Sequence, residues 1–346
     1  GGQNGSGALP TNEGGGQALP VEEADPETRG EPTREESGTE TVLQPTPGSQ
    51  KTVTYTHSML SVANVLLDVQ GDIHVEPATG SEYEISFVLW TPAVGPAAEF
   101  MFDQYELVFE DDLADNVLHV EALSTLKPDS PFACQTVGGL STCIGNPPAT
   151  VSIVAKLPAS FLNLTADANL GDVTIVDQAG AAVEAGTNTG DVRVSGSFAN
   201  LDLETNTGSV HMDGAGGDLE AHSNSGNINV EGTFENVSMS TNQGDLTGTI
   251  AANVLSLDTN QGTATVDWTP VGASEFHHDG NSGNLDLTLP PGAYRLELET
   301  NLGDADVDAR FQSKGEGVWE TEGFESAAVK NYVYSDLNTG SQSVHS

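Results

Sequence analysis

The tripeptide Asn-x-Gly recurs through the second half of the chain and constrains its fold more than any other feature. Successive asparagines are separated by 19, 18, 18, 18, 18, 21, 20 and 37 residues, the last interval being close to two periods. A repeat near 20 residues is typical of a solenoid, in which each repeat forms one coil that stacks on the next. The corners are Asn169 with Gly171, Asn188 with Gly190, Asn206 with Gly208, Asn224 with Gly226, Asn242 with Gly244, Asn260 with Gly262, Asn281 with Gly283, Asn301 with Gly303, and Asn338 with Gly340.

Apolar residues hold fixed places around each corner. Leu201 and Leu203 stand five and three residues before Asn206, and Val210 and Met212 stand four and six residues after it. The other repeats keep these offsets. Alternation of apolar and polar residues indicates strands with one buried side. We therefore predict an all-β fold, a right-handed parallel β-solenoid of about ten coils with two short strands in each coil.

The corner residues suit a tight turn. Glycine adopts positive φ at little steric cost, and asparagine tolerates the left-handed region while its side chain bonds to nearby backbone. The residue after the glycine is nearly always Asp, Asn, Ser or Thr, which can cap a turn with a side-chain oxygen. Stacked coils would place the asparagines above one another as a ladder with a step of roughly 4.8 Å.

The repeats resemble a known family. Segments such as NTGDVRVSG, NTGSVHMDG and NSGNINVEG are similar to the "putative-adhesin" β-solenoid domain of bacterial and archaeal surface proteins, also called toastrack-like. VLLDVQGDIHVEPATGSEYEISFVLW resembles its opening coil, and VSIVAKLP the strand that enters the solenoid. The resemblance covers about residues 60–346. It implies a surface location and an adhesin-like role, with no established reaction or catalytic residues.

The chain divides into three parts by composition. Residues 1–50 are rich in Gly, Pro, Glu and Thr and contain no aromatic residue, which predicts an extended tail or linker. Residues 51–158 alternate in the manner of strands and form a second β-module, while 159–346 hold the solenoid. No segment predicts a helix. The start at Gly1 fits a processed exported chain, and a lipid anchor upstream would be its only route to a membrane.

Cys134 and Cys143 lie in a loop-like stretch, FACQTVGGLSTCIGNPP. A single disulfide that closes this loop is the interpretation we favour, and it implies an oxidising compartment. Two unrelated thiols are the alternative.

The chain carries 51 acidic and 10 basic residues, a formal net charge of −41. Such a surface repels nucleic acid and anionic lipid. It favours cations or basic ligands, and fits either a halophilic habitat or a soluble extracellular surface. We expect an extracellular or cell-surface location, with surface glycans, proteins or further copies of the chain as partners.

Few residues suggest chemistry. Asp172 and Asp191 fall on adjacent coils and are weak calcium candidates, because close carboxylates repel unless a cation bridges them. No other metal or cofactor is expected. Asn4, Asn163 and Asn236 begin glycosylation sequons. His278 should point inward and His277 outward, so the two should not chelate one ion. No hydrolase, metalloprotease or nucleotide-binding motif occurs.

These features favour a non-catalytic structural or adhesive protein, and self-assembly is the sharpest form of that hypothesis. The strand-like segment with Lys51, Val53, Tyr55 and His57 follows the tail and could add to an open sheet edge of a neighbour, giving filaments. Alternatively it forms the first strand of its own module. Other hypotheses are a tethered monomer that binds carbohydrate, a cation or a host component, and a polysaccharide-acting enzyme.

Overall fold

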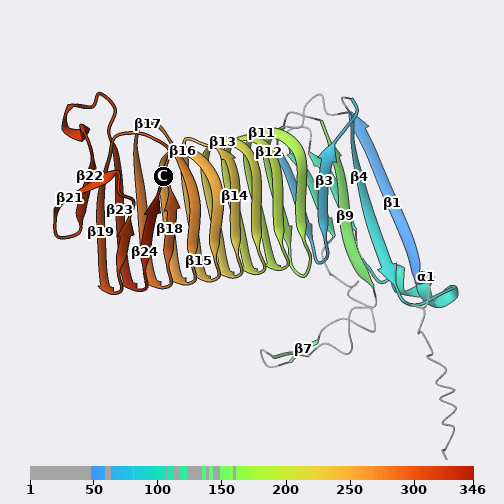
Figure 1. Ribbon diagram of the computed structural model, residues 1–346. Helices are drawn as coiled ribbons and strands as arrows, with labels where there is room; N and C mark the ends of the chain where they lie inside the picture. The colour runs from blue at the N-terminus through green and yellow to red at the C-terminus, as the bar shows by residue number, and fades with distance from the viewer. Residues whose placement is uncertain are drawn as a thin grey trace, which may run out of the picture. The chain divides into compact units, whose positions relative to one another are not determined.

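A computed structural model describes residues 48–58, 64–80, 82–105, 107–112, 117–122, 135–137, 140–142, 149–158 and 161–346 (Figure 1). The chain divides into two compact units, Gly1–Pro45 and Thr46–Ser346, and every described residue lies in the second. Among the described residues, no helix has the length and apolar character needed to cross a bilayer.

The second unit is a stack of parallel coils, the arrangement of a β-solenoid. Each coil contributes a strand before its corner and a strand after it, so the stack has two layers. Layer I contains the strands before the corners and layer II the strands after them. The long strands β11 (Val173–Thr189), β12 (Val192–Thr207), β13 (Val210–Ser225), β16 (Leu246–Gln261) and β17 (Ala264–Ser282) bend from layer II into layer I.

Shorter strands complete the two layers. Layer I also holds β2 (Asn64–Val69), β5 (Val108–Asp112), β6 (Val117–Ala122), β10 (Phe161–Ala168), β15 (Asn236–Gln243), β19 (Tyr294–Leu302), β21 (Phe311–Gly315), β22 (Val318–Thr321) and β23 (Asn331–Thr339). Layer II also holds β1 (Ser49–Ser58), β3 (Ile73–Pro77), β4 (Glu82–Thr91), β9 (Thr150–Leu157), β14 (Ile228–Thr233), β18 (Leu285–Thr288), β20 (Ala305–Val307) and β24 (Gln342–His345). β7 (Gln135–Val137) and β8 (Leu140–Thr142) pair separately.

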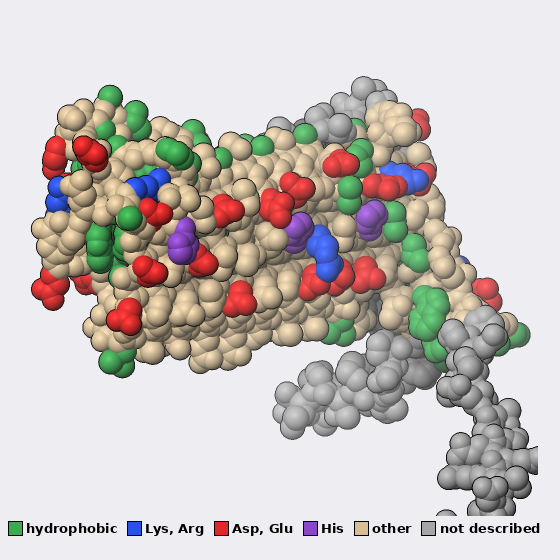
Figure 2. All heavy atoms as spheres, in the orientation of Figure 1, with side chains coloured by type: hydrophobic (Ala, Val, Ile, Leu, Met, Phe, Trp, Pro, Cys, Tyr) green, Lys and Arg blue, Asp and Glu red, His purple; other side chains and the backbone are tan. Residues whose placement is uncertain are grey.

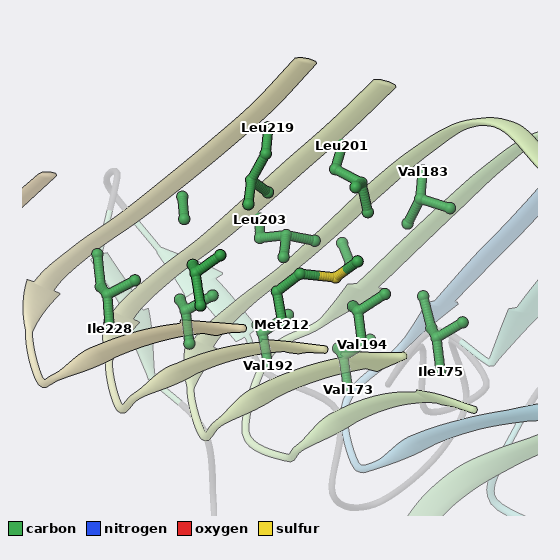
Figure 3. Packing of buried hydrophobic residues seen from close by; sticks show 14 of the residues in the cluster. Val173, Ile175, Val183, Val192, Val194, Leu201, Leu203, Met212, Leu219 and Ile228 are labelled. Carbon is green, nitrogen blue, oxygen red and sulfur yellow. The ribbon is translucent and has the colours of Figure 1, made fainter. Parts of the chain in front are cut away.

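The core lies between the layers. Val183, Leu201 and Leu219 of layer I face Val173, Val192 and Ile228 of layer II (Figure 3), and all six are buried. They occupy the apolar positions that the sequence repeat defines. Burial of this continuous apolar stripe is the main term that stabilises the stack, because each coil alone would leave its inner side exposed.

The sheets continue across residue 158. β2 pairs in parallel with β10, and β3 pairs in parallel with β11, so 64–77 form a coil of the same stack around a corner at Gln70 and Gly71. With the nine Asn-x-Gly corners, this makes ten corners within the described residues. β9 then pairs with β3 and β4, and β1 pairs antiparallel with β4 at the end of layer II.

One helix departs from the prediction. α1 (Pro96–Phe102) follows β4, where the sequence predicted no helix. Pro96 suits the first helical turn because its missing N–H has no intrahelical role there. Ala98 and Phe102 are buried and hold this short helix against the core. η1 (Phe324–Ser326) is a single helical turn near the other end.

The last coils do not follow chain order. β23 pairs with β17 on one side and with β19 on the other, and β24 lies in the same way between β18 and β20. The coil of Asn338 therefore sits between the coils of Asn281 and Asn301. The 37-residue interval therefore does not hold two successive coils, because the chain continues from the outer coil into β21 and β22 and then returns to the space between the two earlier coils.

The outer coil is covered on its far side. β22 pairs antiparallel with β19, and β21 pairs antiparallel with β22. This hairpin occupies the edge that β19 would otherwise present, which is how natural sheets avoid edge-to-edge association.

Candidate binding surface

The asparagine ladder fixes the register of the coils. From Asn188 to Asn281, each Nδ2 donates a hydrogen bond to Oδ1 of the asparagine one coil earlier, at distances from 2.7 to 3.4 Å. Asn338 donates to Asn281 at 3.0 Å, and Asn301 donates to Asn338 at 3.2 Å. The ladder that the sequence predicted is present, with its last two rungs exchanged.

Two further ladders flank it. A buried threonine or serine precedes each asparagine from Asn188 to Asn242, and its hydroxyl donates to a glycine carbonyl of the preceding coil, as from Thr205 to Gly190 at 2.9 Å. At several corners the Asp or Asn after the glycine accepts from the backbone of the next coil, as Asp245 does from the Thr263 N–H at 2.8 Å. The corners are thus bonded between coils, and outward residues of successive coils are held in straight columns.

Layer I is strongly acidic. Its outward positions four residues before the corners place Glu184, Asp202 and Glu220 on adjacent strands. These carboxylates line an open groove of about 690 Å³. None of the three forms an ion pair with another described residue. On the face seen in Figure 2, acidic side chains are likewise spread along the stack, and lysine and arginine occur at few places.

A second groove, of about 510 Å³, lies further along layer I, and we call it the tyrosine groove. The ring of Tyr334 on β23 stacks with that of His277 on β17, with centroids 5.2 Å apart and planes at 16°. Tyr332 continues the stack, with its plane 5° from that of Tyr334. All three side chains are partly exposed. The groove therefore offers the rings of His277 and Tyr334 to solvent.

Carboxylates border these rings. The acidic column consists of Asp258, Asp279, Asp336 and Glu299, which are in register on four adjacent strands and all exposed. Among the described residues none of the four has an ion-pair partner. Desolvation, followed by the carboxylates of Glu297 and Glu275, raises the pKa of Tyr334. The phenol therefore stays protonated and able to donate a hydrogen bond.

The protein-family model described as Toastrack DUF4097 matches residues 151–268. Residues 151–268 are a toastrack domain. This segment contains the corners from Asn169 to Asn260, while the tyrosine groove lies at its C-terminal end and beyond. No curated protein matches the sequence.

Solved structures also match the chain. A "putative lipid binding protein" from Parabacteroides distasonis is 13% identical, with a TM-score of 0.46, over 86% of this chain and 98% of that one. A "putative adhesin" from Parabacteroides merdae is 13% identical, with a TM-score of 0.43, over 86% and 97%. A "putative cell adhesion protein" from Clostridium sporogenes is 9% identical, with a TM-score of 0.26, over 86% and 99%.

The calcium candidates of the toastrack domain meet an arginine. Asp172 and Asp191 lie on adjacent coils, as predicted. The guanidinium of Arg193 bonds to both, 3.1 Å from Asp172 Oδ2 and also in contact with Asp191 Oδ2. The positive charge that the stacked carboxylates require is supplied by this side chain. Within the described residues no cluster of three or more His, Cys, Asp or Glu side chains could hold a metal.

The sequon asparagines inside the toastrack domain use their amides in the stack. Asn163 Nδ2 donates to Asn64 Oδ1 at 2.6 Å, and Asn236 Nδ2 donates to Asp218 Oδ1 at 2.6 Å. This nitrogen is the atom that a glycan would modify, so at both residues a glycan would be attached to an atom that also bonds the neighbouring coil. Asn4, Cys134 and Cys143 lie outside the described residues.

The donor-strand candidates are used by their own chain. Lys51, Val53, Tyr55 and His57 belong to β1, which pairs with β4 along its whole length. Tyr55 packs edge-on against Phe87 at 6.1 Å, and Lys51 lies 3.7 Å from Asp103. In this structure the segment therefore pairs within its own chain.

The sequence pattern predicted that His277 points outward and His278 inward, and this is confirmed, since His278 is 4% exposed. The pattern did not predict the place of Tyr334 or the acidic column. The sequence shows how far each of these residues stands before its corner. It does not show which coils are neighbours, because β23 returns to lie between β17 and β19.

Proposed function

We propose that the protein is a non-catalytic adhesive protein of the cell surface, which binds saccharides through the tyrosine groove of layer I. The observation that carries this proposal is the partly exposed pair of Tyr334 and His277, bordered by the acidic column, whose four carboxylates have no ion-pair partner among the described residues. An open groove with aromatic rings and a few polar groups is suited to binding an amphipathic ligand.

The chemistry points to a class of saccharide. The rings can contact the apolar C–H groups of a sugar, and the Tyr334 hydroxyl can donate to a ring or hydroxyl oxygen. Carboxylates accept hydrogen bonds from sugar hydroxyls, and bonds to charged acceptors are stronger than neutral ones. The acidic column repels uronates and sialylated sugars. We therefore expect neutral or amino sugars.

The stack supports adhesion rather than turnover. Its outward side chains are held in register by inter-coil bonds, so a ligand meets a preformed surface and little ordering is needed on binding. The second groove, with Glu184, Asp202 and Glu220, lies on the same layer. A polysaccharide could contact both grooves, and many weak contacts give strong attachment through multivalency.

The test is glycan binding by the full chain and by Tyr334→Ala. We expect binding to neutral or amino glycans on an array, with little binding to acidic ones, and at least a tenfold weaker affinity for Tyr334→Ala. Thr265→Ala is the matched control, because Thr265 is an exposed residue of layer II. Absence of binding to every neutral and amino glycan, or unchanged affinity of Tyr334→Ala, would refute the proposal.

A filament is the second candidate, and one observation favours it. β1 pairs only with β4 among the described strands, so no described strand occupies its other edge. Pairing of this edge with a second copy would extend the sheet. Negative-stain microscopy of concentrated protein should then show fibres, and substitution Thr54→Pro on β1 should reduce them. Dispersed particles at every concentration would count against filaments.

A further inference from the structure

The last coil of the chain is an inserted element. β23 and β24 lie between two coils that precede them in sequence, and both strands pair in parallel on both sides. The side chain of Asn338 bridges the ladder between Asn281 and Asn301. We call the space that this coil fills the slot.

The slot is shaped for this segment. Val333, Leu337 and Val344 are fully buried in it. Gln342 Nε2 donates to the backbone oxygen of Glu299 at 2.7 Å, and Ser335 Oγ lies 2.9 Å from His278 Nδ1. Without the coil, β17 and β19 would each present a row of unpaired N–H and C=O groups, separated by two strand spacings, about 9.6 Å. Such facing edges bind a strand strongly.

The connection into the slot is a surface segment. Residues 322–330 join β22 to β23 and are mostly exposed, and Phe324 is the buried residue among them. Phe324 contacts Tyr332 edge-on at 5.7 Å, and the Lys330 ammonium lies 4.9 Å from its ring. Nine residues reach about 30 Å when extended. A connection of this length lets the coil reach a slot in a second molecule, where it would form the same hydrogen bonds as in its own slot.

We propose that the coil of β23 and β24 exchanges between two copies of this chain. The occupant is a second copy because the polar contacts of the slot, with Asn281, Asn301 and His278, select the side chains of this coil. Exchange of an identical element creates no new contact and needs only a hinge that can open. Reciprocal exchange gives a closed dimer, and one-way exchange gives a chain of molecules.

The experiment uses full-length chains with single cysteines at facing positions. Ser282 on β17 and Thr339 on β23 are register partners, and both are exposed. One chain carries Ser282→Cys and a second, tagged chain carries Thr339→Cys. The two are mixed, unfolded in denaturant, refolded at high protein concentration and oxidised. Mass spectrometry then identifies the peptide pair that joins 282 to 339.

The control pair is Ser282→Cys with Thr207→Cys, because Thr207 is an exposed corner residue outside the exchanged coil. A chain with both Ser282→Cys and Thr339→Cys should form the bond internally at low concentration. We expect the 282–339 bond between chains at least tenfold above the control pair, rising with protein concentration. A yield equal to the control, or failure of the internal bond, would overturn the proposal.

Discussion

The imidazole Nδ1 of His278 lies 2.9 Å from the hydroxyl oxygen of Ser335, inside the core, and joins β17 to the inserted coil. Nε2 of the same ring is buried and has no hydrogen-bond partner among the described residues. Burial lowers the pKa of His278 from 6.5 to about 4. The folded protein therefore holds a neutral imidazole in a pH range where an unfolded chain would hold a charged one.

This difference predicts acid sensitivity. Below pH 6.5 the unfolded state binds a proton at His278 that the folded state does not bind until about pH 4. As the pH falls from 6.5 to about 4, the free energy of unfolding should therefore fall by about 3 kcal/mol in total. Denaturant unfolding at several pH values measures it. The double variant His278→Leu, Ser335→Ala should lack this component, whereas His277→Gln should keep it. Equal pH profiles for wild type and the double variant would contradict the assignment.

The ladder predicts a graded effect of asparagine removal. Asn224 donates to Asn206 and accepts from Asn242, whereas Asn301 ends the ladder and donates only to Asn338 within the described residues. With about 1 kcal/mol for each hydrogen bond, Asn224→Ala should cost about 2 kcal/mol and Asn301→Ala about 1 kcal/mol. Denaturant midpoints test this, with Gln243→Ala as control. Equal losses of stability in Asn224→Ala and Asn301→Ala would show that the number of ladder hydrogen bonds does not determine the effect.

The corner glycines predict a steric effect distinct from backbone strain. Gly208 has φ 149°, and a Cβ there would overlap the carbonyl oxygen of Gly190 in the preceding coil. Gly315 has a similar φ of 157° but open space around it. Gly208→Ala should therefore destabilise by more than about 3 kcal/mol, and Gly315→Ala by only about 1 kcal/mol. Thermal unfolding compares them. Similar losses of stability in the two variants would mean that the positive φ, and not steric overlap with Gly190, is what requires glycine at position 208.

The ion pairs of Arg193 predict that Ca²⁺ stabilises the protein only when this side chain is removed. Removal of its guanidinium leaves Asp172 and Asp191 stacked without a counter-charge. Arg193→Gln should lose up to about 1 kcal/mol, as is usual for exposed ion pairs, and millimolar Ca²⁺ should restore part of it. Wild-type melting temperature should be the same in Ca²⁺ and in a chelator. An equal rise of the melting temperature in wild type and variant would mean that Ca²⁺ binds at another site.

Unbalanced charge on layer I predicts stabilisation by salt. Desolvation and repulsion from Glu184, Asp68 and Glu204 raise the pKa of Asp167, so its ionised form opposes folding at neutral pH. Asp167→Asn should raise stability by about 0.5 kcal/mol at pH 7 and low salt. The gain should shrink in 1 M salt, which screens exposed charges. Thr165→Asn is the neighbouring control. A loss of stability in Asp167→Asn would contradict this account.

The sequence by itself determined the coil. Corner spacing and the apolar offsets around Asn206 repeat within about 18 residues, so each coil is encoded locally and its inward residues could be named in advance. The same periodicity predicted the ladder, because identical coils in register must align identical side chains. The close approach of Gly208 to Gly190 was not visible, since it depends on the distance between coils.

Only the tertiary structure decided the order of the last coils and the surface they form. An interval of 37 residues does not tell whether the chain moves outward or returns, because both routes bury the same apolar pattern. The return brings Tyr334 beside His277 and Ser335 beside His278, contacts between residues 57 positions apart. Arg193 likewise meets Asp172 only through stacking. Local pattern sets what a coil buries, while the pairing of strands sets which coils become neighbours.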